Sequence, residues 1–301
     1  MQYSVAIVIL NWNGWEYTQS CIASLLEAGY SEGDLIIVDN ASTDGSIPNI
    51  KSHFPKAHLI QNAKNEGFTG GNNRGIQYAL TKGYAYVLLL NNDTQVLPGF
   101  LEFLIEEMKI SGDLAAIQPL IYFMGDKDEI WNAGGNYHAW LGYSQTNYQI
   151  QSAQPYLTEW ISGCAILVRS TVLEKIGLLD HNYFAYFEDV DWSLRMRSQG
   201  FELKVHPKSI IYHEAGAASK SKTKGRQGFL DPKVHFLNVR NQVFQLRKYC
   251  IGPKQWLAWP FHFAKFSLFI FYFTLKGRHS KSKAVMKGIW EGLKTPLRAS
   301  K

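Results

Sequence analysis

The sequence predicts an α/β fold with a mostly parallel central sheet that is flanked by helices. Short apolar runs alternate with segments of helical spacing through residues 1–119, which is typical of right-handed βαβ units. Several of these runs are rich in β-branched residues, as expected of strands that are buried on both faces. The chain is also globular in composition, since 46% of its residues are hydrophobic and 19% are charged.

The elements can be placed in order from these patterns. In the first part we expect strands at residues 5–10, 35–38, 59–60, 86–90 and 115–119, and helices at residues 17–26, 71–79 and 98–110. Residues 120–158 are rich in Tyr, Asn, Gln and Gly and predict a hairpin or a long loop. Further on, we expect strands at residues 164–168, 202–206 and 210–212, and helices at residues 170–176, 188–200 and 234–249.

The apolar run at residues 86–90 ends abruptly at Asn91, Asn92 and Asp93. Ligands of open α/β sheets bind at the carboxyl ends of the strands, so a buried central strand would deliver this carboxylate to a binding edge. Mg²⁺ is usually held by one or two carboxylates together with phosphates. Asp93 is therefore a candidate metal ligand beside a diphosphate. The alternative is a strand that ends in a polar turn.

Two further acids follow the second expected strand. Asp39 stands at the end of that strand and Asp44 lies five residues later. A carboxylate at this place can accept a hydrogen bond from a ribose hydroxyl or a base N–H. An Asx-turn with a helix N-cap is the alternative, and it applies more to Asp44 than to Asp39.

A glycine-rich turn precedes the helix expected at residues 71–79. Gly67, Gly70 and Gly71 fall within five residues and are followed by Asn72. Glycines permit close approach of the backbone to a ligand, and a helix N-terminus suits a phosphate or a sugar hydroxyl. The segment matches neither the Gly-x-Gly-x-x-Gly dinucleotide pattern nor a P-loop.

The second part of the chain carries three acids in one helical turn, Glu188, Asp189 and Asp191. Acids near a helix N-terminus are favourable, which is the structural explanation for them. Crowded carboxylates repel each other, however, and one of them could accept a proton from a hydroxyl group. His213 ends a later strand, where it either ligates a metal or is a satisfied structural residue.

Charge is distributed unevenly along the chain. Residues 1–219 carry a net charge of −10, whereas residues 220–301 carry +16. A basic segment next to the aromatic residues 256–275 suits an anionic membrane surface better than nucleic acid. Pro260, His262 and Lys265 interrupt this stretch, so a helix that lies in the plane of the membrane fits better than one that spans it. Three distant cysteines and the absence of a signal peptide at the start predict a reducing, cytoplasmic location.

Taken together and in this order, these motifs resemble the family 2 glycosyltransferases of the GT-A (Rossmann-like) fold, in particular the bacterial rhamnosyltransferase-like branch. The matching stretches are residues 8–13, 38–42, 65–75, 89–94, 160–169 and 187–191, followed by His213. The resemblance implies a GT-A domain over residues 1–250, with a nucleotide-sugar-binding half (1–119) and an acceptor-binding half (120–250). Residues 251–301 would form a basic, aromatic-rich helical tail that associates with the inner face of the bacterial cell membrane.

The family's chemistry implies roles for the candidate residues. Donor-binding residues would be Asn11, Asp39, Asp44, Gly67, Gly70, Gly71, Asn72, Asn92 and Asp93. Asp189 would be the general base, and acceptor-binding residues would be Trp160, Gly163, Glu188 and Asp191. Asp93 and His213 would hold Mg²⁺ or Mn²⁺. The family's Asp-x-Asp motif reads Asn91-Asn92-Asp93 here, so its first position offers no carboxylate.

The implied reaction is an inverting, metal-dependent transfer from a nucleoside-diphosphate sugar, with dTDP-L-rhamnose as the suspected donor. The acceptor would be a hydroxyl of a lipid-linked or cell-surface glycan. A UDP-sugar (UDP-GlcNAc, UDP-Gal, UDP-Galf or UDP-Glc) is the alternative donor. Two rival functions are a nucleotidyltransferase and a catalytically inactive nucleotide-sugar-binding subunit. No nucleic-acid partner is expected, and a homo-oligomer is left open.

Overall fold

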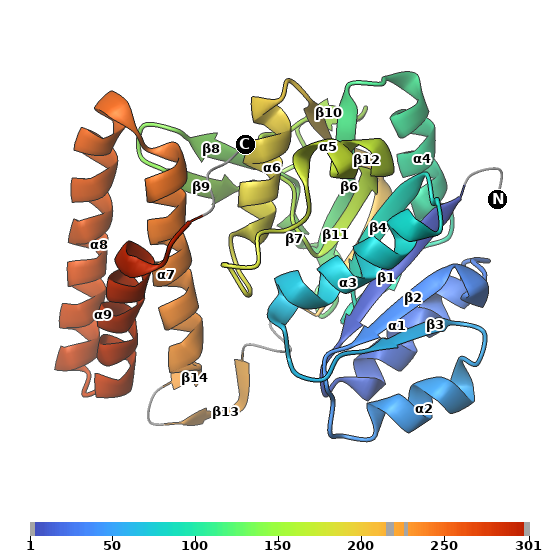
Figure 1. Cartoon of the computed structure of the whole chain (residues 1–301), viewed down its shortest axis with the longest axis horizontal. Coiled ribbons are helices and arrows are strands. Elements are labelled where there is room, and N and C mark those ends of the chain that lie inside the picture. Colours follow the sequence, from blue (N-terminus) through green and yellow to red (C-terminus); the bar gives the residue numbers. More distant parts are fainter. Residues whose placement is uncertain (1–3, 215–219, 226–227, 298–301) are drawn as a thin grey trace. The chain divides into compact units, whose positions relative to one another are not determined.

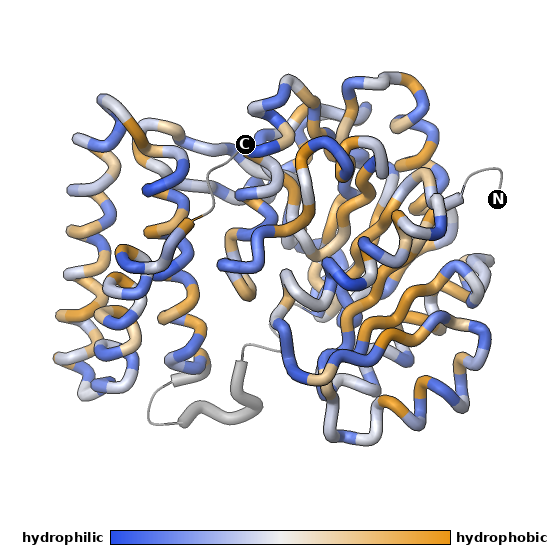
Figure 2. The backbone as a smooth tube through the Cα atoms, viewed as in Figure 1, coloured by the Kyte–Doolittle hydropathy of each residue, from blue (hydrophilic) through white to orange (hydrophobic). Residues whose placement is uncertain are grey.

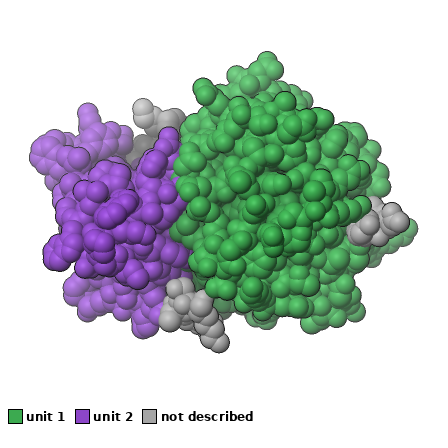
Figure 3. Space-filling model, turned by 90° about the horizontal axis from the view of Figure 1, so that it is seen from above, with its two compact units in different colours: residues 1–136, 146–184, 188–215 green, residues 137–145, 185–187, 216–301 purple. Residues whose placement is uncertain are grey.

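A computed structural model describes residues 4–214, 220–225 and 228–297 and confirms the α/β fold (Figure 1). The chain divides into two compact units, which Figure 3 colours separately. The first comprises residues 1–136, 146–184 and 188–215, and the second comprises residues 137–145, 185–187 and 216–301. The division does not follow the boundary expected at residue 250, because the helix before that residue groups with the C-terminal helices.

The first unit is built around one large sheet. Its helical elements are α1 (Trp15–Glu27), η1 (Glu32–Asp34), α2 (Ser46–His53), α3 (Gly67–Thr81), α4 (Phe100–Ile110), α5 (Ser170–Ile176) and α6 (Glu188–Ser198). The strands of this sheet are β1 (Val5–Asn11), β2 (Leu35–Asp39), β3 (His58–Gln61), β4 (Tyr86–Asn91), β5 (Thr94–Val96), β6 (Leu114–Phe123), β7 (Ile130–Asn132), β10 (Tyr156–Leu157), β11 (Ala165–Arg169) and β12 (Glu202–His213). The hairpin β8 (Gly135–His138) and β9 (Tyr143–Thr146) has residues in both units.

The sheet is parallel on one side and mixed on the other. Its strands follow the order β10-β12-β6-β11-β4-β1-β2-β3, and the pairs from β4 to β3 are all parallel. Strand β11 pairs antiparallel with both β4 and β6, whereas β12 runs parallel to β6. The two short strands expected over residues 202–212 form a single strand, β12, whose register shifts between His206 and Ile210.

Both faces of the central strands are buried, which explains their continuous apolar runs (Figure 2). On β1, Ile7 and Ile9 belong to a core that includes residues of α1 and α4. The alternating residues Ala6 and Val8 belong to a second core that includes residues of α3, α5 and α6. The first parallel strands are thus fixed between two helical layers, and their carboxyl ends form one edge.

Helix α3 begins at Gly67, four residues earlier than expected, so the glycines lie inside the helix and not in a preceding turn. They bring the helix close to the sheet. A Cβ atom on Gly71 would lie 2.3 Å from Leu10 Cδ1, and one on Gly75 would lie 2.4 Å from Val8 Cγ1. Close packing therefore compensates for the conformational entropy that glycine loses in a helix.

The second unit is mainly helical. Its elements are β13 (Lys220–Gly225), β14 (Gly228–Leu230), α7 (Pro232–Tyr249), η2 (Gly252–Lys254), α8 (Gln255–Leu275) and α9 (His279–Lys294). Helices α7, α8 and α9 share a small apolar core formed by Val239, Val243, Phe266, Phe273 and Val285. This is the C-terminal helical extension that the sequence predicts, and in the described part of the chain no helix is both long and apolar enough to cross a membrane.

Candidate active site

Polar residues meet at the carboxyl edge of the parallel strands. Asn11 ends β1 and pairs in register with Asp39, which ends β2. Asn91 ends β4, and its backbone N–H donates to Cys164 O (2.8 Å) at the start of β11. Asp93 follows two residues later. The topology therefore brings together four of the stretches that the sequence singles out.

A chain of buried and partly buried hydrogen bonds joins these strand ends. Asn92 Nδ2 donates to Thr18 Oγ1 (2.9 Å), and the Thr18 hydroxyl donates to Asn11 Oδ1 (2.8 Å). Asn11 Nδ2 then donates to Asp39 Oδ1 (2.8 Å), while Asp39 Oδ2 accepts from the Ser42 N–H (2.9 Å). Asp39 has no exposed surface, so its contacts fix the loop after β2 from within the protein.

Asp44 holds the other end of that loop. Its Oδ1 accepts hydrogen bonds from the Ser46 backbone N–H (3.0 Å) and hydroxyl, and its Oδ2 accepts from the Trp15 N–H (3.4 Å). Burial acts to raise the pKa of Asp44, but these hydrogen bonds outweigh it and lower the pKa. These contacts are those of an Asx-turn, the structural alternative that the sequence offers to a ligand-binding role of Asp44.

The first turn of α3 is held by side-chain amides that donate to its backbone carbonyls. Asn40 Nδ2 donates to Gly67 O (2.9 Å), and Asn72 Nδ2 donates to Phe68 O (2.9 Å). Gly70 lies against Glu66, because a Cβ atom there would lie 2.5 Å from Glu66 Cβ. The residues of α3 that are expected to bind the donor substrate therefore lie in one tightly packed helical segment next to the loop after β2.

Asp93 and His213 come together because β5, which begins at Thr94, pairs with β12 in the register Thr94–His213. Asp93 Oδ1 lies 3.2 Å from His213 Nε2, both residues are buried, and Oδ1 accepts no hydrogen bond from the described residues. Two ligands at right angles around Mg²⁺, each about 2.1 Å from the ion, are about 3 Å apart, so the pair fits a single cation. No third His, Cys, Asp or Glu of the described residues joins them, which leaves positions for ligand oxygens.

Asp189 lies in the first turn of α6 and is held by two backbone N–H groups. Its Oδ2 accepts from Gly163 (3.0 Å) and its Oδ1 from Val190 (2.8 Å). Burial raises the pKa of Asp189 although these hydrogen bonds oppose the rise. Gly163 precedes the Cys164 carbonyl that binds Asn91, so the backbone connects Asp189 directly with the end of β4. A carboxylate with a raised pKa is suited to accept a proton near neutral pH.

Glu188, which precedes Asp189 in the sequence, and Trp160 are both buried. Burial, followed by the charges of Asp189 and Asp191, raises the pKa of Glu188 well above its ordinary value. Its Oε2 has no hydrogen-bond partner among the described residues. Trp160 is 7% exposed and its indole covers Gly135, where a Cβ atom would lie 2.0 Å from Trp160 Nε1.

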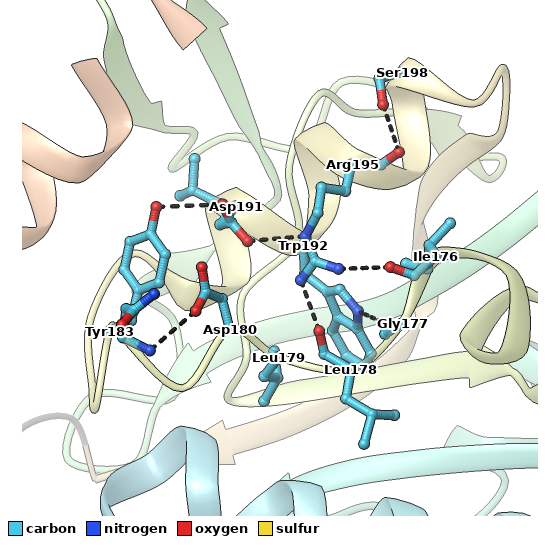
Figure 4. Close-up of polar contacts among 12 residues, drawn as sticks. Ile176, Gly177, Leu178, Leu179, Asp180, Tyr183, Asp191, Trp192, Arg195 and Ser198 are labelled. Carbon is cyan, nitrogen blue, oxygen red and sulfur yellow. Dashed lines mark hydrogen bonds and ion pairs between the residues drawn. The ribbon is translucent and has the colours of Figure 1, made fainter. Parts of the chain in front are cut away.

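Asp191, by contrast, is fully engaged inside the protein (Figure 4). Its Oδ2 accepts from Arg195 Nε (2.9 Å) and its Oδ1 from the Tyr183 hydroxyl (3.2 Å). Arg195 also donates to the carbonyls of Ile176 and Leu178 (2.8 Å each). With no exposed surface, Asp191 anchors the loop before α6, and its contacts do not support the acceptor-binding role expected for it.

The chain enters α6 through a strained turn. Phe184, Tyr186 and Phe187 have φ angles of +63°, +73° and +68°, although none of them is glycine. Such left-handed residues cost about 1–3 kcal/mol each and persist where their surroundings hold them. Three such residues lie immediately before Glu188 and Asp189, and strain of this kind is common at active sites.

The model of the protein family described as "Glycosyl transferase family 2" matches residues 4–177. The chain belongs to glycosyl transferase family 2. Among its relatives, the dTDP-rhamnosyl transferase RfbF of Shigella flexneri is 24% identical over 217 residues, which cover 71% of each chain. An N-acetylglucosaminyl-diphospho-decaprenol L-rhamnosyltransferase of Mycobacterium tuberculosis is 25% identical over 237 residues, covering 71% of this chain and 77% of the relative.

Solved structures of other glycosyltransferases share the GT-A fold of this enzyme. The structure of GalNAc-T7 with UDP, GalNAc and Mn²⁺ aligns with a TM-score of 0.64 at 17% identity, covering 82% of this chain and 48% of that one. The mannosyltransferase PcManGT of Pyrobaculum calidifontis with GDP-Man and Mn²⁺ aligns with a TM-score of 0.60 at 11% identity, covering 97% and 87%. The predicted fold, family and enzyme class are thus confirmed.

Two residues that shape the site of this glycosyltransferase, Thr18 and Asn73, were not given a role from the sequence. Thr18 links Asn92 to Asn11, and Asn73 binds both backbone groups of Leu179 (2.8 and 3.1 Å). Trp131 packs edge-on against His213, with ring centroids 4.4 Å apart. A threonine among the apolar positions Cys21, Ile22 and Leu25 of α1 was the one local signal for Thr18.

Proposed function

We propose that this family 2 glycosyltransferase moves a sugar, with inversion, from a nucleoside-diphosphate sugar to an acceptor hydroxyl. The observation that carries the proposal is the placement of Asp189. Its carboxylate has a raised pKa and is held by Gly163, which is joined through Cys164 to the end of β4. The base Asp189 is thus connected to β11 and the Asp93–His213 pair to β4, and these two strands are neighbours in the sheet. A transfer between two substrates requires a base and a site for the leaving group close to each other.

In the proposed reaction Asp189 accepts the proton of the acceptor hydroxyl, and that oxygen forms a bond to the anomeric carbon. The bond from this carbon to the diphosphate oxygen breaks, and the nucleoside diphosphate departs from the opposite face. Asp93 and His213 would hold the divalent cation, Mg²⁺ or Mn²⁺, which when bound neutralises charge on the departing diphosphate. The Gly163 N–H keeps the carboxylate of Asp189 oriented toward the acceptor.

For the donor we propose dTDP-L-rhamnose, and for the acceptor a lipid-linked saccharide. The two relatives, one a dTDP-rhamnosyl transferase and the other an N-acetylglucosaminyl-diphospho-decaprenol L-rhamnosyltransferase, support this assignment. A UDP-sugar is the alternative, since one structural neighbour holds UDP. Both neighbours described above hold Mn²⁺, which supports a divalent cation at Asp93 and His213.

A ligand panel tests this proposal. Thermal shifts would be measured with dTDP-L-rhamnose, UDP-sugars and the free nucleotides, with and without Mn²⁺. A ligand that binds the folded state adds about 2.7 kcal/mol of stability at a hundredfold excess over its Kd. We expect Mn²⁺-dependent stabilisation by dTDP compounds, and transfer to a lipid-linked acceptor that falls to a small residual rate in Asp189→Asn. Turnover that this substitution leaves unchanged would refute the base, whereas binding without turnover in the unaltered protein would favour an inactive nucleotide-sugar-binding subunit.

We further propose that an anionic bilayer, the inner face of the bacterial cell membrane, covers the outer face of α8. Leu257, Phe261, Leu268, Phe271 and Leu275 follow one another at helical spacing and are between 40% and 69% exposed. On α9, exposed Met286, Trp290 and Leu293 alternate with exposed lysines, and Lys294 Nζ lies 3.8 Å from the Trp290 ring centroid. Apolar side chains beside lysines complement the acyl boundary and the headgroups of such a membrane.

Vesicle flotation tests the membrane surface. The double variant Leu268→Ser/Phe271→Ser should lose most of its binding to vesicles that contain anionic lipid, while it keeps the unaltered melting temperature because both side chains point outward. Ile110→Ser is the matched control, since Ile110 is 76% exposed on α4 of the first unit. Equal flotation of the double variant and the control would rule out this surface.

A further inference from the structure

Helix α7 carries three buried amide side chains. Asn241, Gln242 and Gln245 are 0%, 4% and 1% exposed, although they lie in the middle of a helix whose apolar residues pack beside them. An amide that is removed from water needs hydrogen-bond partners within the protein. The N–H groups of all three amides donate to backbone carbonyls, which separate the amides into two groups, and Asn241 Oδ1 also accepts from Arg240 Nε (3.0 Å).

Asn241 and Gln245 bind three successive carbonyls of the strained turn before α6. Asn241 Nδ2 donates to Ala185 O (2.7 Å) and to Tyr186 O (2.8 Å), and Gln245 Nε2 donates to Phe187 O (3.2 Å). Gln242, which is adjacent to Asn241, donates to Gly142 O (2.8 Å) in a different loop. All of these contacts lie within the second unit.

The turn needs such support because two of its residues are left-handed. Tyr186 and Phe187 have φ angles of +73° and +68°, and residues with side chains keep this conformation where surrounding contacts impose it. Glu188, the next residue, begins α6, and Asp189 follows. Each carbonyl that α7 holds therefore restricts the backbone that leads to the carboxylate of Asp189.

We propose that Asn241 and Gln245 are positioning residues for the transfer reaction, because they hold the left-handed turn that aims Asp189 at the acceptor hydroxyl. They touch neither substrate and act through the backbone of residues 185–187. The inference rests on the proposed role of Asp189 and adds a contribution of the C-terminal helices to catalysis. Residues 234–249, which the sequence predicts only to be a helix, thereby help to position the catalytic base.

The first test compares two changes of the same kind at adjacent positions. Asn241→Asp removes the donor to the turn, and Gln242→Glu removes the donor to Gly142. Both bury a new carboxyl group in α7, so both should lower the melting temperature. We expect kcat to fall about 10- to 100-fold in Asn241→Asp, with the donor Kd unchanged, because small misplacements of a catalytic group have effects of this size. In Gln242→Glu, kcat should stay within twofold of the unaltered enzyme.

The pH profile gives a second readout that a purely structural role would not move. The Gly163 N–H lowers the pKa of Asp189, so a displaced carboxylate should lose this hydrogen bond. The acid limb of the kcat profile should then move to higher pH in Asn241→Asp but not in Gln242→Glu. Gln245→Met, which removes one hydrogen bond without adding a charge, should show the same effect in weaker form and remains testable if Asn241→Asp fails to fold.

A double-mutant cycle separates this inference from the proposed function. In an Asp189→Asn background, Asn241→Asp and Gln245→Met should lower the residual rate no further, because the group they position has lost its function. Two outcomes would overturn the positioning role alone. One is that the rate losses caused by Asp189→Asn and by the α7 variants add up. The other is that the losses of kcat in Asn241→Asp and Gln242→Glu follow the decrease in their melting temperatures to the same extent. Full activity of Asp189→Asn would overturn the proposed base and this inference together.

Discussion

At the scale of residues, the acids at the start of α6 differ in what surrounds them. Asp191 is paired with Arg195 and Tyr183, whereas Glu188 has a carboxylate oxygen without a partner among the described residues. The sequence shows three acids in one turn, and of these only Asp191 has an arginine four residues later, at position 195. This spacing is a local signal for the ion pair, whereas the burial of Asp191 depends on tertiary contacts.

The Asp191–Arg195 pair gives a stability prediction. Arg195→Met leaves Asp191 buried without its ionic partner and frees the carbonyls of Ile176 and Leu178. Loss of one partner of a buried pair costs about 3–5 kcal/mol. Urea denaturation should show a loss of this size. Arg197→Met, which breaks an exposed pair with Glu159 in the same helix, should cost less than about 1 kcal/mol. Similar losses in both variants would contradict the structural role of Asp191.

Glu188 gives a pH prediction. Its pKa in the folded protein lies well above the ordinary value of 4.5, so the folded state binds this proton more tightly than the unfolded state. The corresponding stability is present below pH 4.5 and is lost as the pH rises through the folded pKa. A glutamine stays neutral throughout, so Glu188→Gln should melt higher than the unaltered protein at pH 8, with a difference that disappears toward pH 4.

Thermal unfolding over a pH series measures this difference. Glu27→Gln replaces an exposed glutamate of α1 and should leave the profile unchanged. A melting temperature of Glu188→Gln that is equal to or below that of the unaltered protein at pH 8 would show that ionised Glu188 does not weaken the fold.

At the scale of elements, α9 packs on α7 through two glycines. A Cβ atom on Gly288 would lie 2.8 Å from Phe236 O, and one on Gly292 would lie 2.6 Å from Val243 Cβ. Gly292→Ala should therefore push the helices apart at a cost of about 1–3 kcal/mol, which lowers the melting temperature by several degrees. Gly112→Ala, where an added methyl group meets no atom within 4 Å, should leave the melting temperature unchanged or slightly raised.

Some elements could be predicted from local sequence patterns alone, and others could not. The parallel strands β1, β2 and β4 were predictable because each carries a continuous apolar run that ends in polar residues. Strand β11 has the same kind of run but pairs antiparallel, and residue spacing does not encode direction. The amides of α7 occupy positions that the pattern assigns to a solvated face, and their burial depends on the carbonyls of residues distant in sequence.

At the scale of the whole molecule, the grouping of α7 with α8 and α9 has a consequence for truncation. A chain that ends at Cys250 would keep α7 but lose Phe266, Phe273 and Val285, which cover Val239 and Val243. We expect this truncated protein to aggregate or to melt well below the full chain, as judged by size-exclusion chromatography and thermal unfolding. The Leu268→Ser/Phe271→Ser variant should remain folded, because its changes lie on the outer face. A truncated chain with the full melting temperature would contradict this division.

The contacts between α7 and the turn at residues 185–187 end on main-chain oxygens, and this has a practical meaning for engineering. Carbonyl groups are the same in every amino acid, so these hydrogen bonds from α7 do not depend on which side chains the turn carries. A library that varies residues 185–187, with Gly, Asn and Asp favoured at the two left-handed positions, would therefore change the surface next to the base while its anchoring is retained. Selection for new acceptors can begin at these three positions.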